Sequence, residues 1–155
     1  MPVYRVDELM AQARQLAADY RRATGKTLAV SGEIAVSDAI NLLGLEPAPE
    51  DADGYDALRV RDGTSLKVQV KARAIFGDKQ RPNRVGQLKI DKNWDLTVLV
   101  LMDDDYQPIE MIEATRDAIG DALADTKTNK RGSLSVARFR NIGRCIWSSE
   151  NPSAS

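Results

Sequence analysis

The residues of this chain best suited to hydrolytic chemistry are Asp56, Gln69 and Lys71, which supply a carboxylate, a carboxamide and an ammonium group. Carboxylate and amide oxygens are ligands that Mg²⁺ accepts, and an ammonium group can stabilise the charge that develops on a phosphate during hydrolysis. Gln69 and Lys71 are two residues apart, so a β-strand would place both on the same face. The three side chains can form one site if the chain folds back between Asp56 and Gln69.

A tight turn between them is predicted at Asp62-Gly63, a dipeptide typical of two-residue β-hairpin loops. In such a hairpin Arg61 pairs with Thr64, and counting outward places Asp56 across from Gln69. Directly opposed side chains of an antiparallel pair lie about 4.5–5.5 Å apart at Cβ. A three-residue turn would instead shift the register by one residue and separate the two.

This pattern resembles the PD-(D/E)xK nuclease superfamily, which has the restriction-endonuclease-like fold. Its motif is an acidic residue on one strand and an acidic-x-Lys triplet on the next, and Asp56 and Gln69-Val70-Lys71 match those places. The sequence departs from the motif twice: Tyr55 stands where the name has proline, and Gln69 replaces the acidic residue of the triplet. A Gln-x-Lys variant occurs in some restriction-type branches of the superfamily.

The resemblance implies an α/β fold, a mixed sheet with flanking helices, and Mg²⁺-dependent cleavage of DNA of the restriction or defence type, with Mn²⁺ able to substitute. It implies that Mg²⁺ is held by Asp56, the Gln69 oxygen, the Val70 carbonyl and Glu33, and that Lys71 orients the attacking water or stabilises the transition state. The alternative is a nuclease-fold module that has lost catalysis through Gln69 and binds nucleic acid or a partner protein.

Glu33 lies in the first turn of a helix predicted over Ser31–Leu43, with Ser31 as its N-cap and Gly44 at its end. A carboxylate in the first turn also interacts favourably with the helix dipole. A capping role and a metal-binding role for Glu33 are therefore both open.

The acidic loop over residues 46–54 contains a second candidate metal ligand, Asp53, besides Asp56. Hairpin register places Asp56 opposite Gln69, whereas Asp53 precedes the strand. Asp56 is therefore the preferred ligand.

The strongest one-sided charge follows Lys71, where cations outnumber acids up to Lys92. Cations that neutralise phosphates supply sequence-independent affinity for nucleic acid, although such a segment can also be a solvated loop. Because this segment leaves the predicted catalytic strand directly, we expect it to bind DNA through Arg73, Lys79, Arg81, Arg84 and Lys89.

Composition limits the remaining options. The chain has 155 residues, 43% of them hydrophobic, which predicts one domain over residues 1–147 followed by a disordered tail over residues 148–155. The absence of histidine excludes histidine-based catalysis, and the single cysteine, Cys145, excludes a cysteine zinc site. The sequence shows no signal peptide and no apolar run of membrane length, which predicts a cytoplasmic protein.

Four further elements are predicted from hydrophobic spacing. An amphipathic helix over residues 7–22 would pack on the core or on a second subunit, and a homodimer would suit cleavage of both DNA strands. The apolar run Leu96–Met102 predicts a central, fully buried strand. Residues 108–112 predict a strand near an edge because of Pro108, and residues 114–125 predict a helix.

Overall fold

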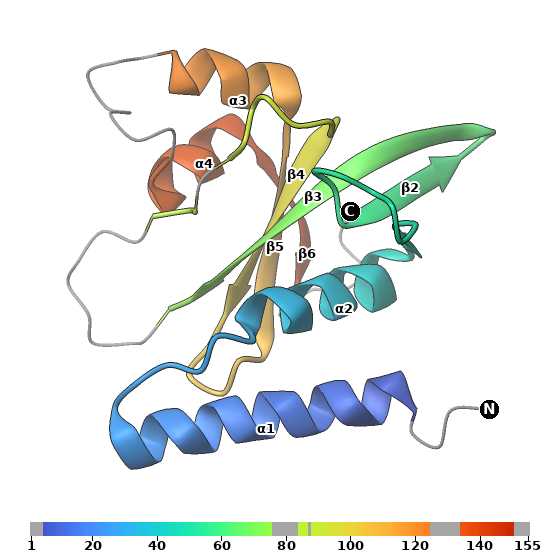
Figure 1. Ribbon diagram of the computed structural model, residues 1–155. Coiled ribbons are helices and arrows are strands. Elements are labelled where there is room, and N and C mark those ends of the chain that lie inside the picture. Colours follow the sequence, from blue (N-terminus) through green and yellow to red (C-terminus); the bar gives the residue numbers. More distant parts are fainter. Residues whose placement is uncertain (1–4, 76–83, 87, 125–133, 151–155) are drawn as a thin grey trace.

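The fold has three layers, with helices on both faces of one β-sheet (Figure 1). The computed structural model describes residues 5–75, 84–86, 88–124 and 134–150. Helices α1 (Val6–Thr24) and α2 (Ser31–Leu43) lie on one side of the sheet, and α3 (Arg116–Leu123) and α4 (Val136–Ile142) lie on the other. The α/β class and the mixed sheet with flanking helices are thus as predicted.

Among the described residues the sheet has six strands, and their order in space follows their order in the chain. Strands β3 and β4 are parallel, and all other neighbouring strands are antiparallel. The strands are β1 (Glu46–Pro47), β2 (Ala57–Arg61), β3 (Thr64–Ala74), β4 (Leu96–Met102), β5 (Pro108–Thr115) and β6 (Arg144–Ser148).

The β2–β3 hairpin has the predicted two-residue turn, because Arg61 pairs with Thr64. Asp62 and Gly63 have φ values of 52° and 77°, and a turn with two positive φ angles matches the twist of the strands that it joins. Strand β3 continues beyond β2 as far as Ala74 and pairs there with β4. The hairpin therefore opens at its far end.

Two hydrophobic clusters cover the two faces of the sheet. Val68 and Val70 of β3 pack in one cluster with Ile34 of α2. Leu99 of β4 packs in the other with Phe139 of α4. All seven residues of β4 are buried, as the apolar run predicted for a central strand.

The strand after β4 lies near an edge, as predicted, because β5 is next to the edge strand β6. Pro108 is the first residue of β5, where the missing N–H is tolerated, and the β4–β5 register shifts between Leu101 and Met102. The following helix begins at Arg116, two residues later than predicted, and the Thr115 hydroxyl caps it by accepting a hydrogen bond from the Ala118 N–H.

Two other predicted boundaries change. The N-cap of α2 is Val30, which makes no side-chain capping bond, so Ser31 is the first helical residue and not the cap. Gly44 ends this helix with a φ of 68°, as predicted. Strand β6 includes Ser148, the first residue of the predicted tail, and residues 151–155 lie outside the described residues. Within the described parts of the chain, no helix is long and apolar enough to cross a membrane.

Candidate active site

Asp56 lies at the open end of the hairpin, where β2 stops pairing with β3. The last pair of the ladder is Ala57 with Val68, one residue before Asp56 would face Gln69. There the Asp56 N–H donates to the Val68 carbonyl over 2.8 Å, and the Val70 N–H donates to Oδ2 of Asp56 over 2.8 Å. The carboxylate is therefore fixed against the strand that carries Gln69 and Lys71.

Gln69 is buried, with only 4% of its surface exposed, and its Nε2 donates to Oγ1 of Thr97 over 2.9 Å. Thr97 is the residue of β4 that pairs with Gln69. Because the amide nitrogen has a partner, the amide oxygen of Gln69 is the atom that can face a ligand.

Lys71 is half-buried two residues further along β3. Burial lowers the pKa of its ammonium group below the usual value, the positive charge of Lys89 lowers it further, and the carboxylate of Asp56 opposes both. Both a positive and a negative side chain thus act on Lys71, and the net effect lowers the pKa of its ammonium group.

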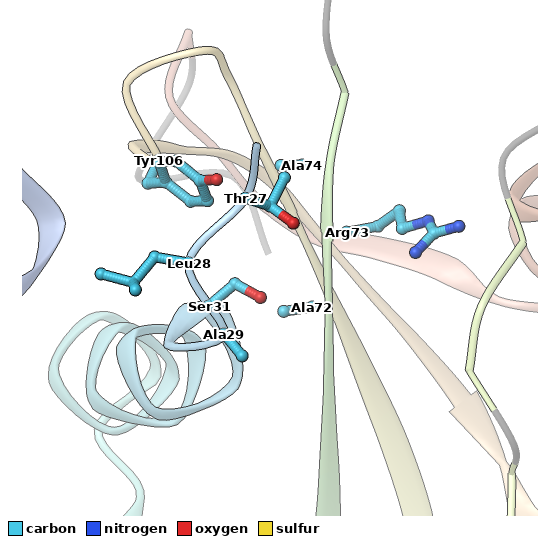
Figure 2. A pocket seen from close by; sticks show the side chains of 8 residues that line it. All are labelled: Thr27, Leu28, Ala29, Ser31, Ala72, Arg73, Ala74 and Tyr106. Atoms are coloured by element: carbon cyan, nitrogen blue, oxygen red, sulfur yellow. The ribbon is translucent and has the colours of Figure 1, made fainter. Parts of the chain in front are cut away.

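Gln69 and Lys71 point to the α3–α4 side of the sheet. They alternate with Val68 and Val70, which pack against α2 on the other side. Figure 2 shows the same alternation at the next position, where the Arg73 side chain lies across β3 from Thr27 and Ser31. The cavity in that view, of about 290 Å³, lies on the α2 side and is separate from this site.

Glu33 is on the other side, exposed in the first turn of α2. It forms no hydrogen bond or ion pair with any residue that the structure describes. The structure therefore brings Asp56, Gln69 and Lys71 together at one end of the hairpin and leaves Glu33 apart from them. The metal-binding role of Glu33 stays a prediction.

Asp53 is exposed, and its Oδ1 lies 3.6 Å from the Nζ of Lys92. The neighbouring Gly54 has a φ of 97°, and a Cβ atom there would lie 2.7 Å from the Cβ of Lys92. The loop before β2 thus packs directly against the segment before β4, which fixes the approach to Asp56.

The basic segment after β3 is described in part. Arg73, Arg84 and Lys89 are exposed there, whereas Lys79 and Arg81 lie outside the described residues. The Nε1 of Trp94 donates to the Lys89 carbonyl over 2.9 Å, which holds Lys89 near the sheet.

Arg116 anchors this segment from the start of α3. Its guanidinium group donates to the carbonyls of Lys92 and Trp94 over 2.8 and 2.9 Å, and also to that of Ile90. It also lies over the Trp94 ring, 4.8 Å from the centroid. Arg116 therefore positions the backbone next to Lys89.

The potential metal donors of this site are one carboxylate, one side-chain amide and one backbone carbonyl. In the described part of the chain, no three Asp, Glu, Cys or His side chains come together as a metal site. Mg²⁺, however, is commonly held by one or two carboxylates together with water and substrate phosphates. Oδ1 of Asp56, the amide oxygen of Gln69 and the Val70 carbonyl are hard oxygen donors of the required kind, so these residues fit Mg²⁺ or Mn²⁺.

Two residues of this site were not foreseen, Thr97 and Arg116. Thr97 carried a readable signal, because it is the one polar residue in an otherwise apolar strand. Arg116 had no such signal in the sequence, because a helix-terminal arginine is common and its carbonyl partners depend on the path of the loop.

Comparison of the sequence with protein-family models and with curated proteins gave no match.

Proposed function

We propose that this protein is a Mg²⁺-dependent endonuclease that hydrolyses phosphodiester bonds in DNA, of the restriction or defence type. The observation that carries the proposal is the grouping of Asp56, Gln69 and Lys71 at the open end of the β2–β3 hairpin. A metal-dependent phosphodiesterase needs such a set, with oxygen donors for a hard cation and a positive group for the phosphate.

Asp56, the Gln69 amide oxygen and the Val70 carbonyl would hold Mg²⁺, with Mn²⁺ able to replace it. A bound Mg²⁺ supplies Lewis-acid polarisation of the scissile phosphate and lowers the pKa of a water molecule. The Lys71 ammonium group would orient the attacking water or stabilise the negative charge of the transition state. We leave Glu33 out of this set, because α2 packs on the other face of β3.

The exposed cations beside the site support a nucleic-acid substrate. Arg73 follows Lys71 by two residues on the same face of β3, and Lys89 lies close enough to lower the pKa of Lys71. Such cations would neutralise backbone phosphates on either side of the scissile bond.

The test is incubation of purified protein with supercoiled plasmid and Mg²⁺, with and without EDTA. We expect nicked and linear products only when Mg²⁺ is free. Lys71→Ala should abolish cleavage, whereas the matched control Lys67→Ala, on the same face of the same strand, should keep it. Wild-type cleavage by Lys71→Ala would refute the proposed site.

One observation favours the second candidate, a DNA-binding module without catalysis. Gln69 already has a partner in Thr97, which gives its amide a structural role that needs no metal. In that case the wild-type protein should bind DNA in a salt-dependent manner and leave the plasmid intact at every Mg²⁺ concentration.

A further inference from the structure

Helix α1 buries its small residues and exposes its large apolar ones. Ala17 and Ala18 are buried, whereas Leu9, Leu16 and Val6 are 40%, 58% and 67% exposed. Figure 1 shows the reason: α1 lies at the outer edge of the molecule, with α2 on one side and no described element on the other. A surface helix ordinarily presents polar residues there.

The apolar residues along the outer side of α1 follow a regular spacing. We define the α1 stripe as Val6, Leu9, Ala13, Leu16 and Tyr20, which are separated by three, four, three and four residues. Four of these residues are exposed, whereas Ala13 is half-buried and also packs against the core. This is the spacing of the a and d positions of a coiled coil, in which the apolar seam of one helix packs into that of another. The stripe is therefore shaped for a second helix.

The charges beside the stripe indicate that the partner helix is α1 of a second copy of the chain. Arg5, Gln12 and Asp19 flank the stripe on one edge at intervals of seven residues. When two copies of α1 pair in antiparallel fashion, this edge meets itself, so Arg5 lies opposite Asp19 of the second copy and Gln12 lies opposite Gln12. The arrangement is self-complementary, as the two-fold axis of a homodimer requires.

A parallel pair would not use these charges. In a parallel pair the acidic first turns of the two helices, each with Asp7 and Glu8, would lie side by side. The basic last turns, each with Arg21 and Arg22, would also lie side by side, so like charges would meet at both ends. The pairs that Arg5 and Asp19 now form, with Asp7 and Arg22, are exposed and hold them weakly. Both side chains can therefore turn to a partner.

We propose that two copies of this chain associate through antiparallel pairing of their α1 stripes, with Gln12 at the two-fold axis. The proposal is independent of the nuclease function. It leaves the open end of each hairpin uncovered, because the candidate site lies on the α3–α4 side of the sheet and α1 on the α2 side.

The first test is the mass of the protein in solution, measured by light scattering over a range of concentrations. Wild type should have the mass of a dimer, and Leu16→Glu should halve it without loss of folding, because Leu16 is exposed. Ala11→Glu adds the same charge on the exposed far side of α1 and should remain dimeric. A monomeric wild type, or a dimeric Leu16→Glu, would overturn the proposal.

The second test is a charge exchange that separates this pairing from non-specific apolar association. Arg5→Asp alone and Asp19→Arg alone should each weaken the dimer, since each sets like charges opposite one another. The double variant should restore its affinity. Failure of the double variant to recover would rule out the antiparallel register.

The third test is disulfide trapping in a Cys145→Ser background, which removes the exposed native thiol. Under mild oxidation Gln12→Cys should form a covalent dimer, because the two residues 12 meet at the axis. Leu16→Cys should not, since its two copies are separated along an antiparallel pair. Cross-linking through residue 16 and not through residue 12 would indicate a parallel pair and refute the proposal.

Discussion

The backbone N–H of Val70 donates to Oδ2 of Asp56 over 2.8 Å at the point where β2 leaves β3. In a regular ladder this donor would bond to a backbone carbonyl, so the carboxylate replaces the missing strand. Asp56 thus has a structural role in addition to the metal-binding role that we propose. The two roles predict different effects of substitution on stability and on cleavage.

Asp56→Asn should separate the structural role of Asp56 from its metal-binding role. The asparagine oxygen can still accept the hydrogen bond from Val70, so the free energy of unfolding should stay close to that of wild type. Asp56→Ala leaves the Val70 donor without an acceptor and should destabilise the protein by about 1–3 kcal/mol. Both variants should lose Mg²⁺-dependent cleavage. Urea unfolding and plasmid cleavage measure the two effects, and full activity in Asp56→Asn would exclude Asp56 as a ligand.

Gln69→Glu should couple stability to metal binding. The carboxylate would be buried where the neutral amide now lies, so the melting temperature without metal should fall. Added Mg²⁺ or Mn²⁺ should restore it and should bind more tightly than to wild type, because a carboxylate adds a full negative charge. Calorimetric titration of both proteins decides the matter. Equal affinity would mean that Gln69 is not a ligand.

Lys89→Met should move the pH dependence of cleavage. The charge of Lys89 lowers the pKa of Lys71, so its removal should raise that pKa. If cleavage needs the Lys71 ammonium form, the loss of rate at alkaline pH should then occur at a higher pH than in wild type. Single-turnover rates at saturating DNA measure this. Lys92→Met, whose charge is not among those that shift Lys71, should leave the alkaline limb unchanged.

Arg73→Gln combined with Arg84→Gln should weaken DNA binding and flatten its salt dependence. Each lost phosphate contact should reduce the slope of log affinity against log salt by about 0.9. Arg61→Gln, an exposed position at the hairpin turn, is the control and should leave the slope unchanged. An unaltered slope in the double variant would assign these cations to a solvated surface.

Local signals predicted most of the fold. Asp62-Gly63 set the turn and therefore the register of β2 and β3, and the apolar run over β4 identified the central strand. That a further strand, β6, pairs with β5 on its outer side could not be predicted in the same way. Pro108 argues against a central position, but as the first residue of β5 it removes no interior hydrogen bond. Strand β6 was hidden because most of its residues are not buried and it begins with a charged residue.

The candidate site was predicted in part for a related reason. Hairpin register is local, so it placed Asp56 beside β3, where its carboxylate accepts a hydrogen bond from the Val70 N–H. The predicted direct pairing of Asp56 with Gln69 does not form, because the β2–β3 ladder ends at Ala57 and Val68. The contributions of Thr97, Lys89 and Arg116 depend on the β3–β4 pairing and on the path between those strands, which no local pattern specifies. The side of the sheet on which Glu33 lies is likewise a tertiary property, fixed by how α2 packs.

The sequential order of the strands has a consequence for how the chain folds. Every strand pairs with its neighbour in sequence, so most of the sheet can form by short-range closures while the polypeptide is still being synthesised. Two joins are longer: the parallel alignment of β3 and β4 requires a connection over residues 75–95, and β6 pairs with β5 only after residues 116–143, which include α3 and α4. Parallel pairing is intrinsically slow, so we expect the β3–β4 join to set the folding rate, which places the kinetic bottleneck in the basic segment between these two strands.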